Sequence, residues 1–104
     1  KGPEFELLSK TEQELLIETQ FTISNDNNRV GYRLKEVFKN QLKPILTSGV
    51  LPGTVQLTPS GELIILMRDC QVTGGYPRVL QLTEEAINIL AQKTTKDKIQ
   101  FELK

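Results

Sequence analysis

Polar residues suited to binding or catalysis are concentrated in one stretch, Asp69–Pro77. The stretch follows the most apolar run of the chain, Leu63–Met67, which predicts a short buried strand. Gly74 and Gly75 allow the backbone to approach another surface or a ligand closely. A polar loop at a strand end is a common place for binding groups. The alternative is a Gly-Gly turn with a capping Asp, and on chemistry alone this simple turn is the preferred interpretation.

Histidine is absent from the sequence, and Cys70 is the single cysteine. These two facts exclude Ser-His-Asp and Cys-His catalysis, His-based metal sites and an internal disulfide. We expect no metal site. A nucleophilic role for Cys70 is disfavoured because no histidine is present to activate it. Any chemistry must use carboxylates, Lys, Tyr, amides or backbone groups, or be shared with another chain.

The charges and the hydropathy of the chain limit its partners. Thirteen basic and thirteen acidic residues give a formal net charge of zero, so we expect no nucleic-acid partner. No apolar run approaches the length of a membrane span, and no signal-peptide pattern is present, so we expect no membrane partner. The 104 residues are enough for one domain, residues 1–104. Because the sequence begins with Lys1, we expect a piece of a longer protein.

Short strands and frequent turns dominate the pattern and predict a mainly β domain, either a barrel or a strongly curled sheet, with one or two short helices. Ser9 and Glu12 form a capping-box pattern that predicts a helix ending near Glu18. A second helix is predicted over residues 83–91, with Thr83 as its N-cap. Strands are predicted at residues 4–8, 21–24, 29–34, 45–48, 54–57, 63–67 and 98–103, and a second apolar run occupies residues 79–82. Loops or exposed connections are predicted at residues 25–28, 35–43, 50–53, 59–61 and 94–97.

Two arginines flank a glycine and a tyrosine in the run Arg29–Leu34. Either Arg29 or Arg33 offers a guanidinium fork for a carboxylate or a phosphate. A solvated strand start with a bulge glycine is the simpler interpretation, and without other information it is the preferred one.

Four stretches taken together resemble the C-terminal half of a known family, in the right order and spacing: residues 29–34, 48–56, 69–77 and 96–101. The family is that of allophanate hydrolase subunit 2, also called the biotin-dependent carboxyltransferase-like family or the family of the C subunit of 5-oxoprolinase. The most specific part is Gln71–Pro77, which reads Gln-Val-Thr-Gly-Gly-Tyr-Pro. The resemblance runs from about Gly2 to the C-terminus.

The resemblance implies a cyclophilin-like β-barrel, or part of one, in a cytoplasmic bacterial protein that works with a sister subunit similar to allophanate hydrolase subunit 1. The leading expectation is a subunit of an ATP-dependent 5-oxoprolinase, which opens 5-oxoproline to glutamate. One alternative is the carboxyltransferase part of a urea carboxylase or urea amidolyase, which receives carboxyl from biotin. Another is a non-catalytic regulator that relieves inhibition of a histidine kinase. The sequence has no Gly-rich phosphate loop with a Lys and no Met-Lys-Met biotinylation signature. We therefore expect ATP on another part of the complex and biotin on another protein.

The resemblance also reverses the preference for a simple turn at Asp69–Pro77. Asp69 and Gln71 match the acidic and amide positions of the signature and are the expected catalytic residues. A urea or a lactam presents an N–H donor beside a C=O acceptor, which a carboxylate and an amide complement. The expected substrate-binding residues are Thr73, Gly74, Gly75 and Tyr76, with Gln56, Arg29, Tyr32 and Arg33 in a second tier. The backbone at Gly74 and Gly75 is suited to approach an oxyanion or a phosphate.

Three positions depart from the family pattern. Cys70 stands where the family usually has Arg, Asn28 where Asp usually precedes the arginine, and Val72 where Thr is more usual. The missing Arg removes an expected charge contact.

Overall fold

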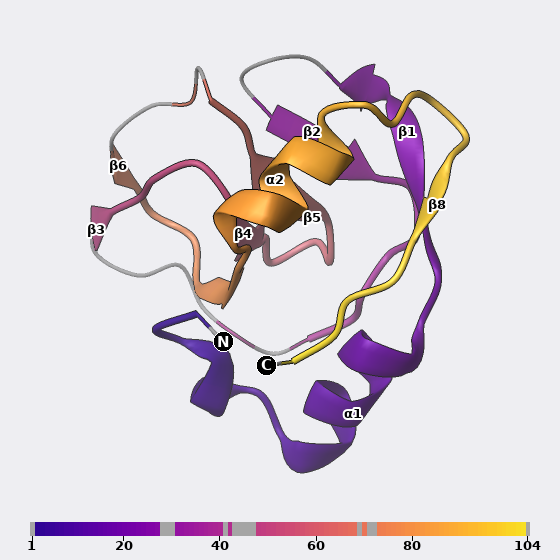
Figure 1. The fold of residues 1–104 in the computed structure, drawn as a ribbon. Coiled ribbons are helices and arrows are strands. Elements are labelled where there is room, and N and C mark those ends of the chain that lie inside the picture. The colour runs from indigo at the N-terminus through magenta and orange to yellow at the C-terminus, as the bar shows by residue number, and fades with distance from the viewer. Residues whose placement is uncertain are drawn as a thin grey trace.

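The computed structural model describes residues 2–27, 31–40, 42, 48–68, 70 and 73–103. In this part the chain forms a curled six-stranded antiparallel sheet, a separate two-stranded ribbon and short helices (Figure 1). The elements in chain order are the 3-10 helix η1 (Phe5–Leu7), α1 (Lys10–Glu18), β1 (Phe21–Asn27), β2 (Gly31–Leu34), β3 (Ser48–Gly49), β4 (Thr54–Leu57), β5 (Leu63–Leu66), β6 (Thr73–Gly74), β7 (Arg78–Gln81), α2 (Glu84–Leu90) and β8 (Lys98–Ile99). The predicted mainly β architecture is confirmed.

The six strands follow the order β7-β4-β5-β2-β1-β8, so β7 and β8 lie at the two edges. The sheet therefore has the form of half a barrel within the described residues. The neighbouring strands β4 and β5 form a hairpin, in which Leu57 pairs with Leu63. The turn that leads into β4 is also confirmed, because Thr54 N–H donates to Leu51 O and Gly53 has φ 92°. A type II turn requires this left-handed conformation at its third residue.

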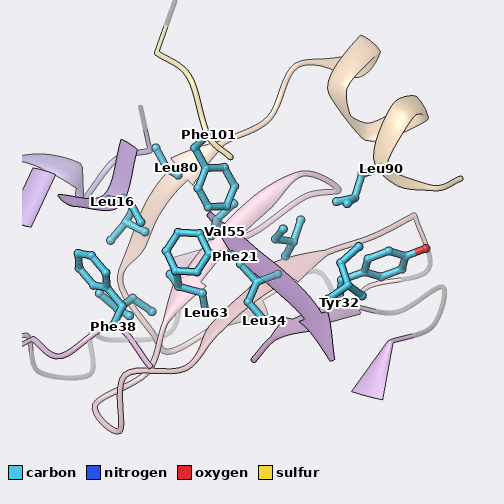
Figure 2. Packing of buried hydrophobic residues seen from close by; sticks show 14 of the residues in the cluster. Leu16, Phe21, Tyr32, Leu34, Phe38, Val55, Leu63, Leu80, Leu90 and Phe101 are labelled. Atoms are coloured by element: carbon cyan, nitrogen blue, oxygen red, sulfur yellow. The ribbon is translucent and has the colours of Figure 1, made fainter. Parts of the chain in front are cut away.

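The core fills the concave side of the sheet, where side chains from both helices and from the C-terminal segment meet (Figure 2). The rings of Phe21 and Phe101 pack with their centroids 5.7 Å apart. Ile87 and Leu90 bring the apolar face of α2 into this core. The largest fully buried apolar side chains are those of Phe5, Leu16, Phe21, Ile23, Val55, Leu57, Leu63, Ile65, Val79 and Pro77.

Several predicted boundaries were wrong where tertiary contacts override local pattern. Residues 4–8 were predicted as a strand but contain η1, because Gly2 N–H donates to Val79 O and Glu4 N–H to Arg78 O, after which the chain turns away from β7. The predicted loop at 25–28 begins too early, since β1 extends to Asn27. The connection after β2 is not fully exposed either, because Phe38 is only 4% exposed and joins the core.

Two further predicted strands differ from the structure or lie partly outside its described residues. The predicted C-terminal strand is ordered as a strand only over Lys98–Ile99, although Phe101 beyond it is buried. Most of the strand predicted at residues 45–48 lies outside the described residues, and β3 begins at Ser48.

The Glu4 carboxylate and the Arg78 guanidinium hold the N-terminal segment against β7. Arg78 Nε donates to Glu4 Oε1 at 2.7 Å and Nη2 donates to Oε2 at 2.8 Å, and the Arg78 backbone N–H donates to Oε1 at 2.9 Å. Hydrogen bonds from Arg78 outweigh the cost of burial and lower the pKa of Glu4. Its carboxylate in turn raises the pKa of Arg78. Such a bidentate pair is geometrically specific as well as charge-assisted.

We expect the capping box of α1 to stabilise the protein measurably. Glu12 N–H donates to Ser9 Oγ at 3.1 Å, and Ser9 N–H donates to Glu12 Oε1 at 2.8 Å. Ser9→Ala should lower the free energy of unfolding, measured by urea denaturation, by about 1 kcal/mol. Thr11→Ala, at an exposed position of the same turn, is the control and should leave stability unchanged or slightly higher. Equal losses in the two variants would contradict the cap assignment.

The Glu4–Arg78 pair predicts a pH-dependent contribution to stability. Folding lowers the pKa of Glu4 below its ordinary value of 4.5, so its contribution is complete above that pH and is lost as pH falls through the folded pKa. Glu4→Gln should therefore lower the free energy of unfolding by about 1–2 kcal/mol at pH 7, and the difference from wild type should shrink in acid. Glu14→Gln, on the exposed side of α1, controls for general loss of charge. A difference that persists undiminished at low pH would show that the charge plays no part.

Candidate functional site

The structure describes only part of the predicted site. Asp69, Gln71 and Arg29 lie outside the described residues, so their roles stay predictions. The departures at Asn28 and Val72 lie outside them as well, whereas Cys70 is described and is half-buried. The candidates whose surroundings the structure describes are Gln56, Gly74, Gly75, Tyr76, Tyr32 and Arg33.

A row of four residues crosses the sheet and contains two of these candidates. Arg33 on β2 pairs with Ile64 on β5, Ile64 pairs with Gln56 on β4, and Gln56 pairs with Arg78 on β7. Directly opposed residues of antiparallel strands project to the same face. We call these four residues the cross-strand row. The β4–β7 register shifts next to Gln56, an irregularity of the kind that re-aims side chains near functional sites.

The β3–β6 ribbon covers this face of the sheet at Gln56. Ser48 pairs with Gly74 and Gly49 with Thr73 in the ribbon, and Figure 1 shows it standing beside the main sheet. Arg78 Nη1 donates to Gly49 O at 2.9 Å and so ties the ribbon to β7. Val50 and Leu66 are buried outside the main core cluster, which is consistent with a second, smaller buried region on this face.

Gly74 lies directly against the side-chain amide of Gln56. A Cβ atom at position 74 would overlap Gln56 Nε2 and would stand 3.5 Å from Val50 Cγ1. The absence of a side chain at Gly74 is therefore what allows the ribbon to sit on the amide. This contact joins the Gly-Gly motif, predicted from the sequence as a binding loop, to the second-tier candidate Gln56.

Gln56 is only 2% exposed, and its side-chain amide nitrogen has no hydrogen-bond partner. Among the described residues it is the one buried side-chain nitrogen or oxygen in this condition. Leaving a buried donor unsatisfied costs about 1–3 kcal/mol, so native proteins seldom keep one without a reason.

The two arginines of the cross-strand row are neutralised. Arg33 forms an ion pair with Glu62, and Arg78 forms the bidentate pair with Glu4. The described part of this face therefore presents paired charges around an uncharged amide. This arrangement favours a ligand with a neutral polar group over an anionic ligand. Arg33, for which the sequence suggested a carboxylate or phosphate ligand, is paired with Glu62 instead.

Tyr32 lies apart from this group. It pairs with Ile65 on the core side of the sheet, where Figure 2 shows it among the buried side chains, and its hydroxyl donates to Lys93 O at 3.3 Å. The structure therefore does not bring Tyr32 together with Gln56. Tyr76 follows the ribbon directly and is 38% exposed, while Gly74 and Gly75 are half-buried.

An open hollow in the described part of the structure lies elsewhere. It measures about 590 Å³, is bordered by α2 and the C-terminal segment, and is lined largely by apolar residues such as Leu82, Ile89 and Leu103. Its lining includes none of the candidate residues. Among the residues that the structure describes, no group of His, Cys, Asp or Glu side chains is arranged to hold a metal ion. Nor does that part contain a helix of the length and apolarity needed to cross a membrane.

Sequence reasoning missed two features that shape this site. The Glu4–Arg78 pair joins positions far apart in the chain, so no local sequence pattern predicts it. The contact between Gly74 and Gln56 is equally non-local. The available signals were the amide of Gln56, between two hydrophobic residues of strand β4, and the glycine pair that follows β5.

The chain is similar to proteins of known name over almost its whole length. It is 38% identical over 93 residues to the C subunit of 5-oxoprolinase of Escherichia coli strain K12, covering 88% of this chain and 30% of that protein. It is 32% identical over 101 residues to the C subunit of 5-oxoprolinase of Haemophilus influenzae, covering 95% of this chain and 33% of that protein. The chain thus spans about a third of the length of these relatives.

The fold has a close counterpart among solved structures. Two crystal structures of the protein TTHA0988 match with TM-scores of 0.81 and 0.79 at 24% identity, over 98% of this chain and 20% of that one. This similarity confirms the fold, and at this identity it shows nothing further.

The family model described as the carboxyltransferase domain, subdomain A and B, matches residues 1–103. Together with the two named relatives, this match confirms the resemblance that the sequence motifs indicated. The chain belongs to the carboxyltransferase domain family, subdomain A and B.

Proposed function

We propose that this chain is part of one subunit of an ATP-dependent 5-oxoprolinase, which opens the lactam of 5-oxoproline to glutamate together with sister subunits. The observation that carries the proposal is the 38% identity to a protein named as the C subunit of 5-oxoprolinase, over 88% of the chain. The neutral polar surroundings of Gln56 are compatible with it, because the reacting group of a lactam is an uncharged amide.

The proposed chemistry places complementary groups on the two ends of the lactam amide. The Asp69 carboxylate accepts a hydrogen bond from the lactam N–H, and the Gln71 amide donates one to the lactam oxygen. Backbone N–H groups at Gly74 and Gly75 stabilise negative charge that develops on that oxygen during attack by water. Thr73 and Tyr76 belong to the same loop. ATP binds to another part of the complex, and a sister subunit similar to allophanate hydrolase subunit 1 completes the active site.

A second candidate function is supported by the description of the family model as a carboxyltransferase domain. In this alternative the same groups bind urea, which also presents an N–H donor beside a C=O acceptor. The carboxyl group is delivered by biotin carried on another protein. The two candidates differ in substrate and carrier, so one set of assays separates them.

We expect the intact protein, co-expressed with its sister subunits, to hydrolyse ATP faster when 5-oxoproline is added. Asp69→Ala should reduce this stimulated rate by at least about 10²-fold, because it removes the acceptor for the lactam N–H. The control is Asp97→Asn, since the Asp97 carboxylate accepts from Thr94 N–H at 2.8 Å and an amide oxygen can replace it. The control should retain nearly the wild-type rate.

The same assay has two outcomes against the proposal. Stimulation by urea in the presence of a biotin carrier protein, without stimulation by 5-oxoproline, would favour the carboxyltransferase. No stimulation by either compound, from a complex shown to be assembled and folded, would contradict both enzymatic candidates.

A further inference from the structure

The buried amide of Gln56 is unlike the other buried polar side chains of the described residues. These are Thr54 and Thr58, and both are satisfied. Thr54 Oγ1 donates to Gln81 Oε1 at 2.8 Å, and Thr58 Oγ1 accepts from Glu62 N–H at 3.0 Å. Of the three buried polar side chains, only that of Gln56 therefore has a nitrogen or oxygen without a hydrogen-bond partner.

Gln81, on the neighbouring strand β7, shows how this protein satisfies a glutamine when its role is structural. Its oxygen accepts from Thr54 Oγ1, and its nitrogen donates to Pro52 O at 3.1 Å and to Leu82 O at 3.3 Å. The two glutamines therefore form a natural pair for comparison, one with partners at both ends of its amide and one whose nitrogen has none.

The identity of the missing acceptor can be argued from charge. The described arginines of the cross-strand row are paired with Glu62 and Glu4, so neither adds uncompensated positive charge beside Gln56. The unused group is a neutral N–H donor. Its best complement is a neutral oxygen acceptor, such as the carbonyl of a lactam, an amide or a urea, because a carboxylate buried here would lack a countercharge.

We infer that Gln56 Nε2 donates a hydrogen bond to the carbonyl oxygen of the substrate and that the β3–β6 ribbon shifts away from β4 to admit it. The lactam identity of the substrate rests on the proposed function. A movement is needed because the amide nitrogen is buried and Gly74 lies directly against it. The ribbon is held by two-residue strands and by the Arg78 Nη1 bond to Gly49 O. Substrate binding then supplies the acceptor that the free protein lacks.

The test uses the full-length protein in complex with its co-expressed sister subunits, and it measures binding and stability separately. Gln56→Met keeps the length of the side chain and removes the donor. We expect it to weaken binding of 5-oxoproline and of 2-pyrrolidinone at least tenfold in isothermal titration calorimetry, while Tm stays equal or rises. Gln81→Met is the matched control and should give the reverse, a lower Tm with Kd values within twofold of wild type. Proline, which lacks the lactam carbonyl, should bind neither wild type nor Gln56→Met measurably.

Three outcomes of this experiment would overturn the inference. The first is unchanged lactam Kd values in Gln56→Met. The second is a fall in Tm as large as that of Gln81→Met, which would give the Gln56 amide a structural partner. The third is proline binding that Gln56→Met abolishes, which would make the acceptor a carboxylate.

A second pair of variants tests the contact with the ribbon. Gly74→Ala places a methyl group where the Gln56 amide lies, whereas a Cβ at Gly49, on the partner strand, meets no atom within 4 Å. We expect Gly74→Ala to lower both Tm and lactam affinity, and Gly49→Ala to leave both near wild type. If Gly74→Ala matches Gly49→Ala in both measurements, the amide does not lie beneath Gly74 and the inference is wrong.

Failure of the inference can be told apart from failure of the proposed function. If 5-oxoproline stimulates ATP hydrolysis but Gln56→Met leaves its KM unchanged, the function stands and the inference falls. If 5-oxoproline has no effect while urea binds wild type and not Gln56→Met, the function falls and the carbonyl-donor role stands. If neither lactam nor urea binds the wild-type protein, the inference is overturned.

Discussion

Burial of strand β4 on both of its faces is the constraint on which the rest of this structure depends. Val55 and Leu57 pack into the main core, while Thr54 and Gln56 are buried on the opposite side. Both faces of an interior strand can be buried only if a second layer of the structure covers the face opposite the main core. Here the second layer is the small β3–β6 ribbon, tied to β7 by Arg78, which is itself fixed by Glu4. The N-terminal segment, the edge strand and the candidate loop are thus linked through one guanidinium.

This double burial also explains why the described part of the candidate site, around Gln56, is neutral. The charged groups near it are engaged in ion pairs that serve the architecture, which leaves an amide and glycine backbone as the described polar groups at the centre. Buried, uncharged surroundings of this kind suit a substrate whose reacting group is an amide. In such surroundings a single hydrogen bond is stronger than in water, and an unused donor is correspondingly costly.

Features set by local chemistry could be predicted from the sequence, and features set by distant contacts could not. The Ser9–Glu12 capping box, the turn at Gly53 and the helix that follows Thr83 each depend on residues a few positions apart, and all were correctly predicted. The N-terminal 3-10 helix was mistaken for a strand because its path depends on β7. For the site, the family signature indicated Gln56 and the glycine pair, but only the fold shows that Gly74 lies on the Gln56 amide and that Tyr32 points into the core.

The central claim is that the Gln56 amide lacks an acceptor in the free protein and gains one from a substrate carbonyl. The most direct measurement is the side-chain amide proton signal of Gln56 in full-length protein labelled with ¹⁵N-glutamine, assigned by its absence from Gln56→Met. We predict that one of its two protons moves downfield and saturates as 5-oxoproline is added, and that proline has no such effect. A signal that already shows a strong hydrogen bond in the free protein, or that does not respond while 5-oxoproline demonstrably binds, would contradict the account.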